Sequence, residues 1–362
     1  MTALFLVAFT GTGAGFVYRS LQGGIEQHEL DPILGTDRPT VEATDSQGPN
    51  DSLDGRAVNL LIMGTDSRDG EENAELGGGD APGMRADTTL LVHVAANRSR
   101  VDVVSIPRDL VVDIPSCRLP DGRETRARLT GQGWPEHQRM WNVPFSLGGS
   151  TGHIGYAAAC TLKTFESMTQ IPVDDFVVVD MAGFRGMVDA IGGVDMCFEQ
   201  DMSSVQANLD VTAGCHTLDG EAALAVARAR KGPGLGDGSD IGRIDRQQQL
   251  LTNMVDQVLE RNVMTDFGEL FQFLRAATSS LITGDKIGDL TTMAGLAYSL
   301  REIDQGDVTF VTMPYDWAGA RVHPNDLSED LWDSIRADEP MALPPEPEQT
   351  ESPPETTPGA GT

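Results

Sequence analysis

The sequence is poor in positive charge. Lysine and arginine together number 26, against 55 aspartates and glutamates, and the net charge is −29 over 362 residues. Proteins that bind nucleic acids or anionic membranes over a broad surface need a basic face to attract phosphates. The composition therefore argues against both classes, and any phosphate-binding site in this chain must be built locally from a few basic residues.

Several motifs of catalysis and metal binding are also absent. The six histidines occur without an HExxH pattern, and the four cysteines without a CxxC or Cys/His metal spacing. The chain has neither a GxSxG nucleophile motif nor a GxxxxGK(S/T) phosphate loop. These absences argue against a zinc hydrolase, a serine hydrolase of the α/β type and a P-loop nucleotidase.

Cysteine is scarce but even in number, at Cys117, Cys160, Cys197 and Cys215. An even count suits an exported protein with two disulfides, and the alternative is four buried thiols in a cytosolic core. Three pairings are possible. Because Cys197 and Cys215 bracket one loop between segments that we expect to be neighbours, we predict that these two pair and that Cys117 pairs with Cys160.

The N-terminal apolar run is short for a membrane-spanning helix, which needs about 20 residues. Residues 3–17 are uncharged and include three glycines. We interpret residues 1–21 as a membrane anchor that is truncated at its cytoplasmic start. A signal peptide would need a basic start and a cleavage site, neither of which is clear. A buried N-terminal helix is the other alternative.

Two further segments have the composition of unfolded chain. Residues 22–55 are polar and rich in Asp, Gly, Pro and Thr, which predicts a flexible linker. Residues 339–362 are acidic and rich in proline, which predicts a disordered tail. The folded domain is therefore expected over residues 56–338.

Within that domain, strand-like and helix-like segments alternate. Apolar runs predict buried strands, of which the second and third form a hairpin, at 58–63, 88–94, 101–106, 176–179 and 308–312. Helical periodicity predicts helices at 156–168, 181–191, 240–259, 267–281 and 289–301. The order favours one α/β domain with a mixed sheet and helices on both faces.

Arginines occur after residue 226 where folding alone gives them little reason to be. Val226, Arg228 and Arg230 alternate, which predicts an extended segment with both arginines on one face. A glycine-rich loop follows. These two arginines therefore become candidates for binding an anion.

The next predicted helix also has arginines at an unusual position, close to its N-terminus. Asp240 is suited to cap it, and Arg243 and Gln247 then share a stripe with the apolar residues 250, 254 and 258. Arg243 and Arg246 lie near the helix N-terminus, where the macrodipole disfavours cations. A bound anion would remove the conflict. Pairing with nearby aspartates is the alternative.

Arginine and aspartate occur together at three predicted strand ends. The pairs are Asp66 with Arg68, Arg85 with Asp87, and Arg108 with Asp109. Ligands of open α/β sheets gather at such ends. Two carboxylates and several guanidinium groups suit a divalent cation and a phosphate, although any one pair is also a common local salt bridge.

Six ordered blocks carry a family resemblance. They read NLLIMGTDSR, RADTTLLVHV, VDVVSIPRDLVVDIP, FRGMVDAIGGVDM, LDGEAALAVARARK and DIGRIDRQQQLL. The chain resembles the LytR-CpsA-Psr family of cell-wall glycopolymer transferases, of the actinobacterial type, from residue 56 to 259 and onward to 338. This resemblance implies an αβα sandwich with a mixed central sheet and a lipid tunnel between sheet and helices.

The resemblance also implies roles for individual residues. Asp66 and Asp87 would bind Mg²⁺, and Asp87 and Arg108 would be catalytic. The pyrophosphate would be held by Arg68, Arg85, Arg108, Arg228, Arg230, Arg243 and Gln247. One departure concerns a lysine that the family carries just before an asparagine, because this chain reads Arg139, Met140, Trp141, Asn142. Arg139 could supply the missing cation from the neighbouring position.

The implied function is that of an extracytoplasmic phosphotransferase. It would move a glycopolymer from a polyprenyl-pyrophosphate carrier onto peptidoglycan, with Mg²⁺ as cofactor. The protein would be a single-pass protein of the cell membrane and would bind no nucleic acid. The alternatives are a polyprenyl-pyrophosphate phosphatase, in which water replaces the sugar acceptor, and a non-catalytic protein that binds the lipid carrier or scaffolds the wall.

Overall fold

A computed structural model describes most of the domain. The described residues are 19, 21–35, 38–39, 51–66, 84–235, 240–260, 281–319 and 321–341. Within these ranges, no helix combines the length and the apolar character that crossing a bilayer requires. The apolar run at residues 3–17, the tail beyond residue 341 and residues 267–280 of a predicted helix lie outside the described residues.

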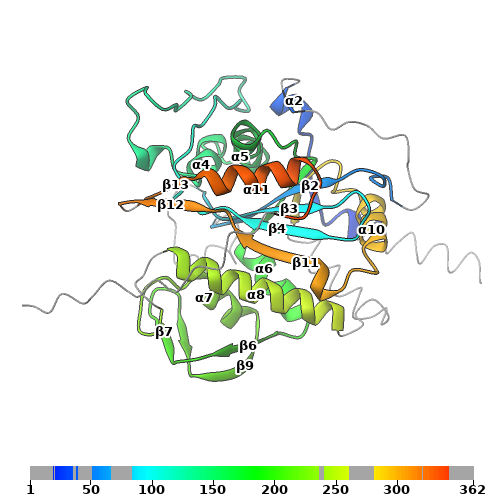
Figure 1. The fold of residues 1–362 in the computed structure, drawn as a ribbon, viewed down its shortest axis with the longest axis vertical. Helices are drawn as coiled ribbons and strands as arrows, with labels where there is room; N and C mark the ends of the chain where they lie inside the picture. Colours follow the sequence, from blue (N-terminus) through cyan, green and yellow to red (C-terminus); the bar gives the residue numbers. More distant parts are fainter. Residues whose placement is uncertain are drawn as a thin grey trace, which may run out of the picture.

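A seven-stranded mixed sheet forms the centre of the molecule, in the order β1-β10-β5-β2-β3-β4-β11 (Figure 1). Its strands are β1 (Glu26–His28), β2 (Val58–Thr65), β3 (Ala86–Val94), β4 (Val101–Ser105), β5 (Asp175–Val179), β10 (Leu281–Gly284) and β11 (Val308–Thr312). The predicted hairpin is confirmed, since β3 and β4 pair antiparallel, and β2 lies between β3 and a parallel β5. The central strands β2 and β5 are mostly apolar and buried because helices cover both faces of the sheet.

Helices form a layer on each side of the sheet, as predicted (Figure 1). One layer contains α2 (Asp31–Leu34), α4 (Val143–Gly148), α5 (Ile154–Thr169) and α11 (Asp326–Arg336). The other contains α6 (Met181–Ala190), α7 (Gly220–Arg228) and α8 (Asp240–Glu260). The helix α10 (Leu290–Ser299) lies at one end of the sheet, and its N-cap Asp289 accepts hydrogen bonds from the N–H groups of Thr291 and Thr292.

Shorter elements complete the chain. Three two-stranded sheets pair β6 (Val194–Phe198) with β9 (Gly214–Leu218), β7 (Met202–Ser204) with β8 (Leu209–Val211), and β12 (Tyr315–Ala318) with β13 (Arg321–Pro324). Two 3-10 turns are η1 (Glu136–Gln138) and η2 (Gln305–Asp307). The pair β6 and β9 lies below the second helix layer in Figure 1, and the hairpin β12–β13 projects from one side.

Three aromatic residues fix the first helix layer on the sheet. Phe165 of α5 lies between two tryptophans, with ring centroids 6.3 Å from Trp141 and 5.8 Å from Trp332 of α11, both edge to face. All three side chains are buried in the largest apolar cluster. Because each such ring contributes about 2 to 3 kcal/mol on burial, this cluster anchors α5 and α11 on one face and leaves the other for α6, α7 and α8.

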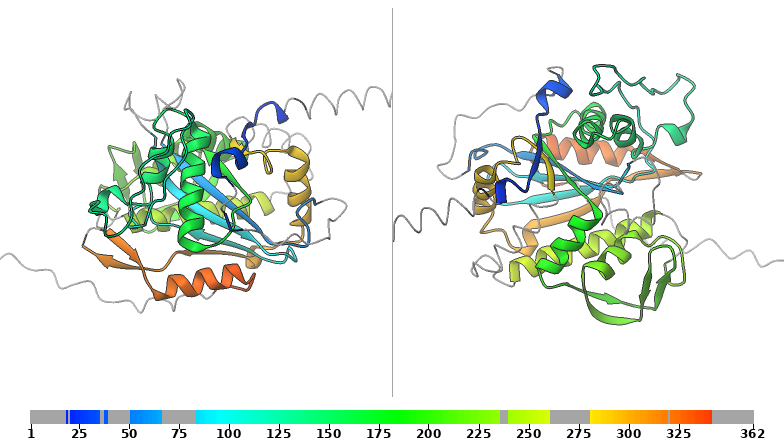
Figure 2. Two further views of the ribbon diagram at one scale, coloured as in Figure 1. Left: turned by 90° about the horizontal axis from the view of Figure 1, so that it is seen from above. Right: turned by 180° about the vertical axis from the view of Figure 1, so that it is seen from behind.

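Part of the segment that we predicted as linker is folded. The strand β1 pairs in parallel with β10 from the other end of the chain, and Figure 2 shows the two side by side. Leu30 and Leu34 belong to the main apolar cluster, and Asp51 is buried and paired with Arg98. At the other end, Met341 is also buried in this cluster. The folded domain therefore extends beyond residues 56–338 in both directions.

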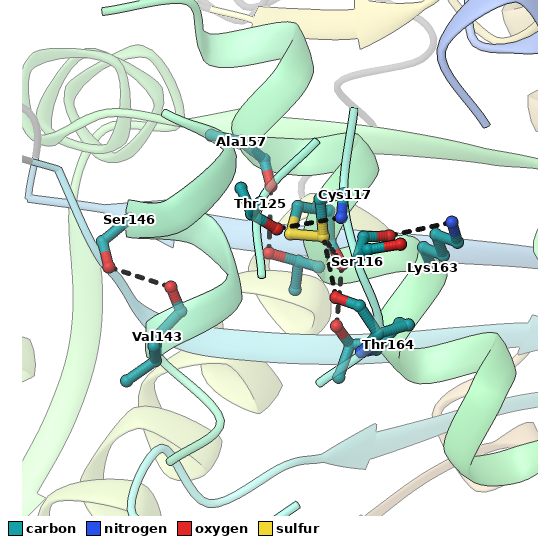
Figure 3. Close-up of a disulfide and its surroundings, with 11 residues drawn as sticks. Ser116, Cys117, Thr125, Val143, Ser146, Ala157, Lys163 and Thr164 are labelled. Atoms are coloured by element: carbon teal, nitrogen blue, oxygen red, sulfur yellow. Dashed lines mark hydrogen bonds between the residues drawn. A yellow bond between two sulfur atoms is a disulfide. The ribbon is translucent and has the colours of Figure 1, made fainter. Parts of the chain in front are cut away.

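Both predicted disulfides are present. Cys117 bonds to Cys160 with a Cα–Cα distance of 5.3 Å, and Cys197 bonds to Cys215 across the β6–β9 pair. Figure 3 shows the first disulfide, which ties the segment around Cys117, between β4 and α4, to α5. The N–H of Cys117 donates to Thr125 and the ammonium of Lys163 donates to the carbonyl of Ser116, so hydrogen bonds reinforce the same junction.

The prediction of an extended segment at 226–230 is wrong for the first half of that segment. The helix α7 runs through Arg228, and its N-cap Asp219 accepts a hydrogen bond from the N–H of Ala222. The helix ends at Arg228, and Ala229 is extended, with φ −63° and ψ 127°. Two-residue alternation over so short a stretch is also compatible with the end of a helix, where Arg228 is the last residue and Arg230 follows the turn of the chain.

Candidate functional site

A cavity of about 550 Å³ lies between the sheet and the second helix layer. One wall comes from β2, β3 and β5, and the facing wall from α6, α7 and α8, with a contribution from the segment after β7. Its position between sheet and helices is the one expected of the predicted tunnel.

The cavity is apolar along most of its length and polar at one end. The apolar lining includes Ile62, Leu90, Val177, Val179, Met181, Phe184, Met187, Leu224, Leu250, Leu251, Met254 and Leu281. Six charged or amide residues that we predicted for the site also line the cavity: Asp66, Asp87, Arg228, Arg230, Arg243 and Gln247. These groups lie at the sheet edge where β2 ends and β3 begins. The lining thus has the polarity of a molecule with a long apolar chain and an anionic head.

Asp87 is the centre of the polar end. Its Oδ1 accepts a hydrogen bond from Nη1 of Arg108 at 3.0 Å, and its Oδ2 accepts one from Nη2 of Arg230 at 2.8 Å. Burial alone would raise the pKa of this carboxyl, but the charges of Arg230, Arg108 and Arg243 outweigh it and hold the pKa below its ordinary value. Asp87 is therefore ionised at neutral pH, and it orients two guanidinium groups toward one point.

Arg243 is buried at the start of α8, with only 3% of its surface exposed. Its Nη2 donates to the backbone carbonyl of Asp87 at 2.9 Å. Gln247, one turn later, accepts a hydrogen bond from the Thr88 hydroxyl and donates to the carbonyl of Ala227. The predicted stripe on α8 is confirmed, because Arg243, Gln247 and the apolar residues 250 and 254 all line the cavity.

Arg246 has a different role from the one its position predicted. Its Nη2 donates to the carbonyl of Ala229 at 2.6 Å, and it does not line the main cavity. Burial, followed by repulsion from Arg243, lowers the pKa of Arg246, and Asp245 opposes that change. Arg246 therefore holds the backbone between Arg228 and Arg230 in place.

Asp66 lies at the end of β2 and faces the N-terminal end of β3. Its Oδ1 accepts the N–H of Arg85 at 2.7 Å, and its own N–H donates to the carbonyl of Arg85. The Arg85 side chain is exposed and is not part of the cavity wall. Arg68 lies outside the described residues. The geometry thus brings Asp66 to the site, whereas Arg85 contributes there through its backbone.

Arg139 does not take the place of the missing lysine. Its Nη1 donates to Oδ1 of Asp113 at 2.9 Å and to the Thr130 hydroxyl. The cavity wall includes neither Arg139 nor Met140. Asp113 thus neutralises Arg139 at a distance from the cavity.

The donor set at this site suits Mg²⁺ better than zinc. The two carboxylates of Asp66 and Asp87 both line the cavity and offer oxygen ligands. Over the described ranges, no three His, Cys, Asp or Glu side chains are grouped as a protein-only metal site would require. Magnesium is commonly bound by one or two carboxylates together with substrate phosphates, so this pair fits such an ion.

Sequence reasoning missed several residues of the site. Phe184 and Met187 of α6 line the apolar part, and Thr88 joins β3 to α8 through Gln247. The first two occur in a block that resembles the family, so the block itself was the available signal. Thr88 also occurs in such a block, but no local pattern could predict its hydrogen bond with Gln247, which is 159 residues away.

Comparisons with known proteins agree with this fold. The LytR_cpsA_psr family model matches residues 33–332. The probable cell wall biosynthesis protein LcpB of Corynebacterium glutamicum is 29% identical over 290 residues, which cover 77% of this chain and 61% of that protein. The polyisoprenyl-teichoic acid–peptidoglycan teichoic acid transferase TagU of Oceanobacillus iheyensis is 30% identical over 236 residues, covering 65% and 62% respectively.

A solved structure has the same fold. The LytR-Csp2A-Psr enzyme from Actinomyces oris superposes with a TM-score of 0.57 at 21% identity, and the match covers 86% of this chain and 95% of that one. The chain spans about three fifths of the length of the two curated relatives. Because the family model matches most of the chain, residues 33–332, the protein belongs to the LytR_cpsA_psr family.

Proposed function

We propose that this protein transfers a glycopolymer from a polyprenyl-pyrophosphate carrier to peptidoglycan. The observation that carries the proposal is the polarity of the cavity. Its lining is mostly apolar, and it includes Arg228, Arg230 and Arg243 together with three carboxylates, those of Asp66, Asp87 and Asp180. A polyprenyl chain matches the apolar part, and its pyrophosphate matches the guanidinium groups.

The arginines would bind the pyrophosphate and stabilise charge on the departing group. Arg108 and Arg230 are already oriented by Asp87, and Arg243 is fixed by the carbonyl of the same residue. Pre-oriented donors stabilise developing charge without reorganisation during the reaction. We propose Asp87 and Arg108 as the residues closest to the reacting phosphorus, with Gln247 and Arg228 as further contacts to the pyrophosphate.

The reaction that we propose is a substitution at the phosphorus bonded to the sugar. A hydroxyl oxygen of peptidoglycan forms a new P–O bond, while the bond from that phosphorus to the bridging oxygen breaks. The hydroxyl proton is released, and polyprenyl phosphate leaves with the bridging oxygen. The products are a phosphodiester between the glycopolymer and peptidoglycan, and the lipid monophosphate.

Magnesium is proposed as the cofactor, held by Asp66 and Asp87. When bound, the ion would supply positive charge to phosphate oxygens, as divalent cations do in phosphoryl transfer. The chain's own contribution is the placement of the two carboxylates: Asp66 is fixed by the backbone of Arg85, and Asp87 by Arg108 and Arg230. We further propose that residues 1–21 anchor the protein in the cell membrane with its domain on the outer side.

The test is a transfer reaction with the purified chain. It contains a lipid-pyrophosphate-linked oligosaccharide and soluble peptidoglycan fragments, with Mg²⁺ or with a chelator. We expect a phosphodiester-linked product that forms with Mg²⁺ and is lost in chelator. Release of sugar phosphate by water alone would replace the proposal with a phosphatase, and lipid binding without any turnover would replace it with a scaffold. Equal product in chelator would remove the proposed cofactor.

A further inference from the structure

An exposed tryptophan lies on a hairpin beside the polar end of the cavity. Trp317 of β12 has 57% of its surface exposed, far more than any other tryptophan in the described part of the chain. The ring of Tyr315 stands edge to face against it, with centroids 5.8 Å apart and an angle of 89°. The tyrosine thus limits how the indole can turn, and more than half of the tryptophan stays accessible to solvent.

The hairpin is fastened to the segment that carries the site. Its β13 strand accepts a hydrogen bond at the carbonyl of Val322 from the N–H of Val111 at 2.9 Å. Arg321 lies 3.6 Å from Asp109, which in turn lies 3.7 Å from Arg108. Arg108 then contacts Asp87 at 3.0 Å. A continuous chain of charged groups therefore joins the hairpin to the centre of the polar end.

Sheet topology places the aromatic pair at the same edge. The strands β4 and β11 are parallel neighbours, with Thr312 opposite Ser105, so the chain beyond each leaves the sheet at one edge. Arg108 follows β4, and Tyr315 follows β11. Burial and then the charge of Asp245 raise the pKa of the Tyr315 phenol. Tyr315 is therefore close to Asp245, which lies near the start of α8. The aromatic pair thus lies outside the cavity but beside its polar end.

We infer that Trp317 and Tyr315 form a platform for a pyranose ring of the peptidoglycan acceptor. A pyranose ring has a face of C–H groups and a rim of hydroxyls. An indole face suits the first, whereas Asp316, Arg321 and His323 lie on the opposite face of the hairpin and do not line the platform. This inference rests on the proposed function, because it assigns the substrate class that approaches the site from outside the cavity.

The geometry of substitution favours the acceptor over the carrier-bound sugar. If the lipid and its phosphate lie in the cavity, the attacking hydroxyl must approach the phosphorus from the side opposite the departing group. The hairpin that carries the platform lies outside the cavity and is joined to Asp87 through Arg321, Asp109 and Arg108. A membrane surface fits less well, because Asp316 and Glu136 on and beside the hairpin would be repelled by anionic lipid.

The test measures the binding of soluble peptidoglycan disaccharide-peptide fragments by calorimetry. We expect Trp317→Ala to weaken fragment binding about 10-fold, the value for losing one stacked ring, and Trp317→Phe to weaken it less. The matched control is Tyr298→Ala, because Tyr298 is also exposed but lies on α10 at the far end of the sheet. Binding of a lipid pyrophosphate without sugar should be unchanged in all three variants.

Several outcomes would overturn the inference. Fragment binding that is equal in Trp317→Ala and the unmodified chain would remove the platform. A loss confined to the sugar of the lipid-linked donor would assign the platform to the donor, and a loss of binding to anionic vesicles alone would assign it to the membrane. These are binding measurements, so they test the platform separately from the transfer reaction. If fragments bind in a Trp317-dependent way but no transfer occurs, the proposed function is refuted and the platform is not.

Discussion

Nη2 of Arg230 donates to Oδ2 of Asp87 across 2.8 Å, although 143 residues separate the two in the sequence. Arg230 follows α7 and Asp87 opens β3, so the contact closes the polar end of the cavity between the helix layer and the sheet. The carboxylate balances guanidinium groups that would otherwise repel one another. The carboxylate thereby keeps several cations close enough to share one pyrophosphate.

Guanidinium geometry should matter at this site, beyond its positive charge. Arg243→Lys keeps the charge but loses the planar fork that reaches both Asp87 and a phosphate. We expect it to weaken binding of lipid pyrophosphate about 10-fold or more, measured by calorimetry. Arg123→Lys is the matched control, because the side chain of Arg123 is 74% exposed and its guanidinium donates to Asp121, away from the cavity. Equal affinities for the two variants would contradict a specific arginine site.

The apolar part of the cavity should select for lipid length. Met254 lines it from α8 and is partly exposed to it, so Met254→Trp should fill space that a polyprenyl chain needs. We expect weaker binding of long-chain lipid pyrophosphate and unchanged binding of inorganic pyrophosphate. Leu327→Trp on the exposed side of α11 serves as a control for the added ring. The tunnel assignment fails if long and short ligands are weakened alike.

Asp175 should make stability depend on pH. Burial raises its pKa to about 6, although the N–H groups of Ile287 and Phe176 donate to it and oppose that change. Because this folded-state pKa lies above the ordinary value of 3.8, the folded protein binds the proton more tightly than the unfolded chain. The free energy of unfolding should therefore fall as pH rises from about 4 to about 6, by on the order of 2 kcal/mol.

The check for this effect is Asp175→Asn, which cannot titrate. Urea unfolding of both proteins at pH 4, 5, 6 and 7 gives their difference in free energy of unfolding. We expect the unmodified protein to lose stability relative to the variant as pH rises through this window, and a difference that is independent of pH would rule the effect out.

The Cys117–Cys160 disulfide should contribute substantially to stability. It closes a separation of 43 residues, for which loop entropy of the unfolded chain gives about 4 kcal/mol. We expect Cys117→Ser with Cys160→Ser to lower the free energy of unfolding by roughly that amount in denaturant titrations. Non-reducing peptide mapping checks the bond directly, and free thiols at both positions in protein from the cell envelope would contradict it.

Local patterns in the sequence predicted most of the sheet. The strand β2 is largely an apolar run, and it is buried at most positions because helices cover both faces of the sheet. The strand β1 was missed because three residues in a polar segment have no periodicity, and its pairing with β10 comes from the rest of the fold. The segment at Val226 was misjudged because alternation over five residues also occurs at a helix end.

Several residues of the site could be predicted from the sequence, but the contacts between them could not. The placement of charged residues singled out Asp87, Arg230 and Arg243, and the resemblance gave them roles, but their mutual contacts depend on separations of 143 and 156 residues, which no local pattern encodes. Arg139 shows the opposite case. Its sequence position suggested a role in the site, yet Asp113 is close enough to bind it elsewhere.

The central claim is that Asp87 serves catalysis, and its exchange for asparagine tests this most directly. The side chains of Asp87, Arg108 and Arg230 are 25%, 18% and 33% exposed, so solvent screens their pairing and the fold should tolerate Asp87→Asn. Asparagine has nearly the same shape and keeps one oxygen that accepts a hydrogen bond from an arginine, so we expect lipid pyrophosphate binding to be largely retained.

The decisive measurement is therefore the rate of transfer from a lipid-pyrophosphate-linked oligosaccharide to peptidoglycan fragments, taken per folded molecule for Asp87→Asn and the unmodified protein. We expect a fall of about 100-fold or more, the usual size of losing one preorganised interaction with developing charge, because Asp87 positions the cations that stabilise that charge. An unchanged rate per folded molecule would contradict it and reduce Asp87 to a structural partner of Arg108 and Arg230.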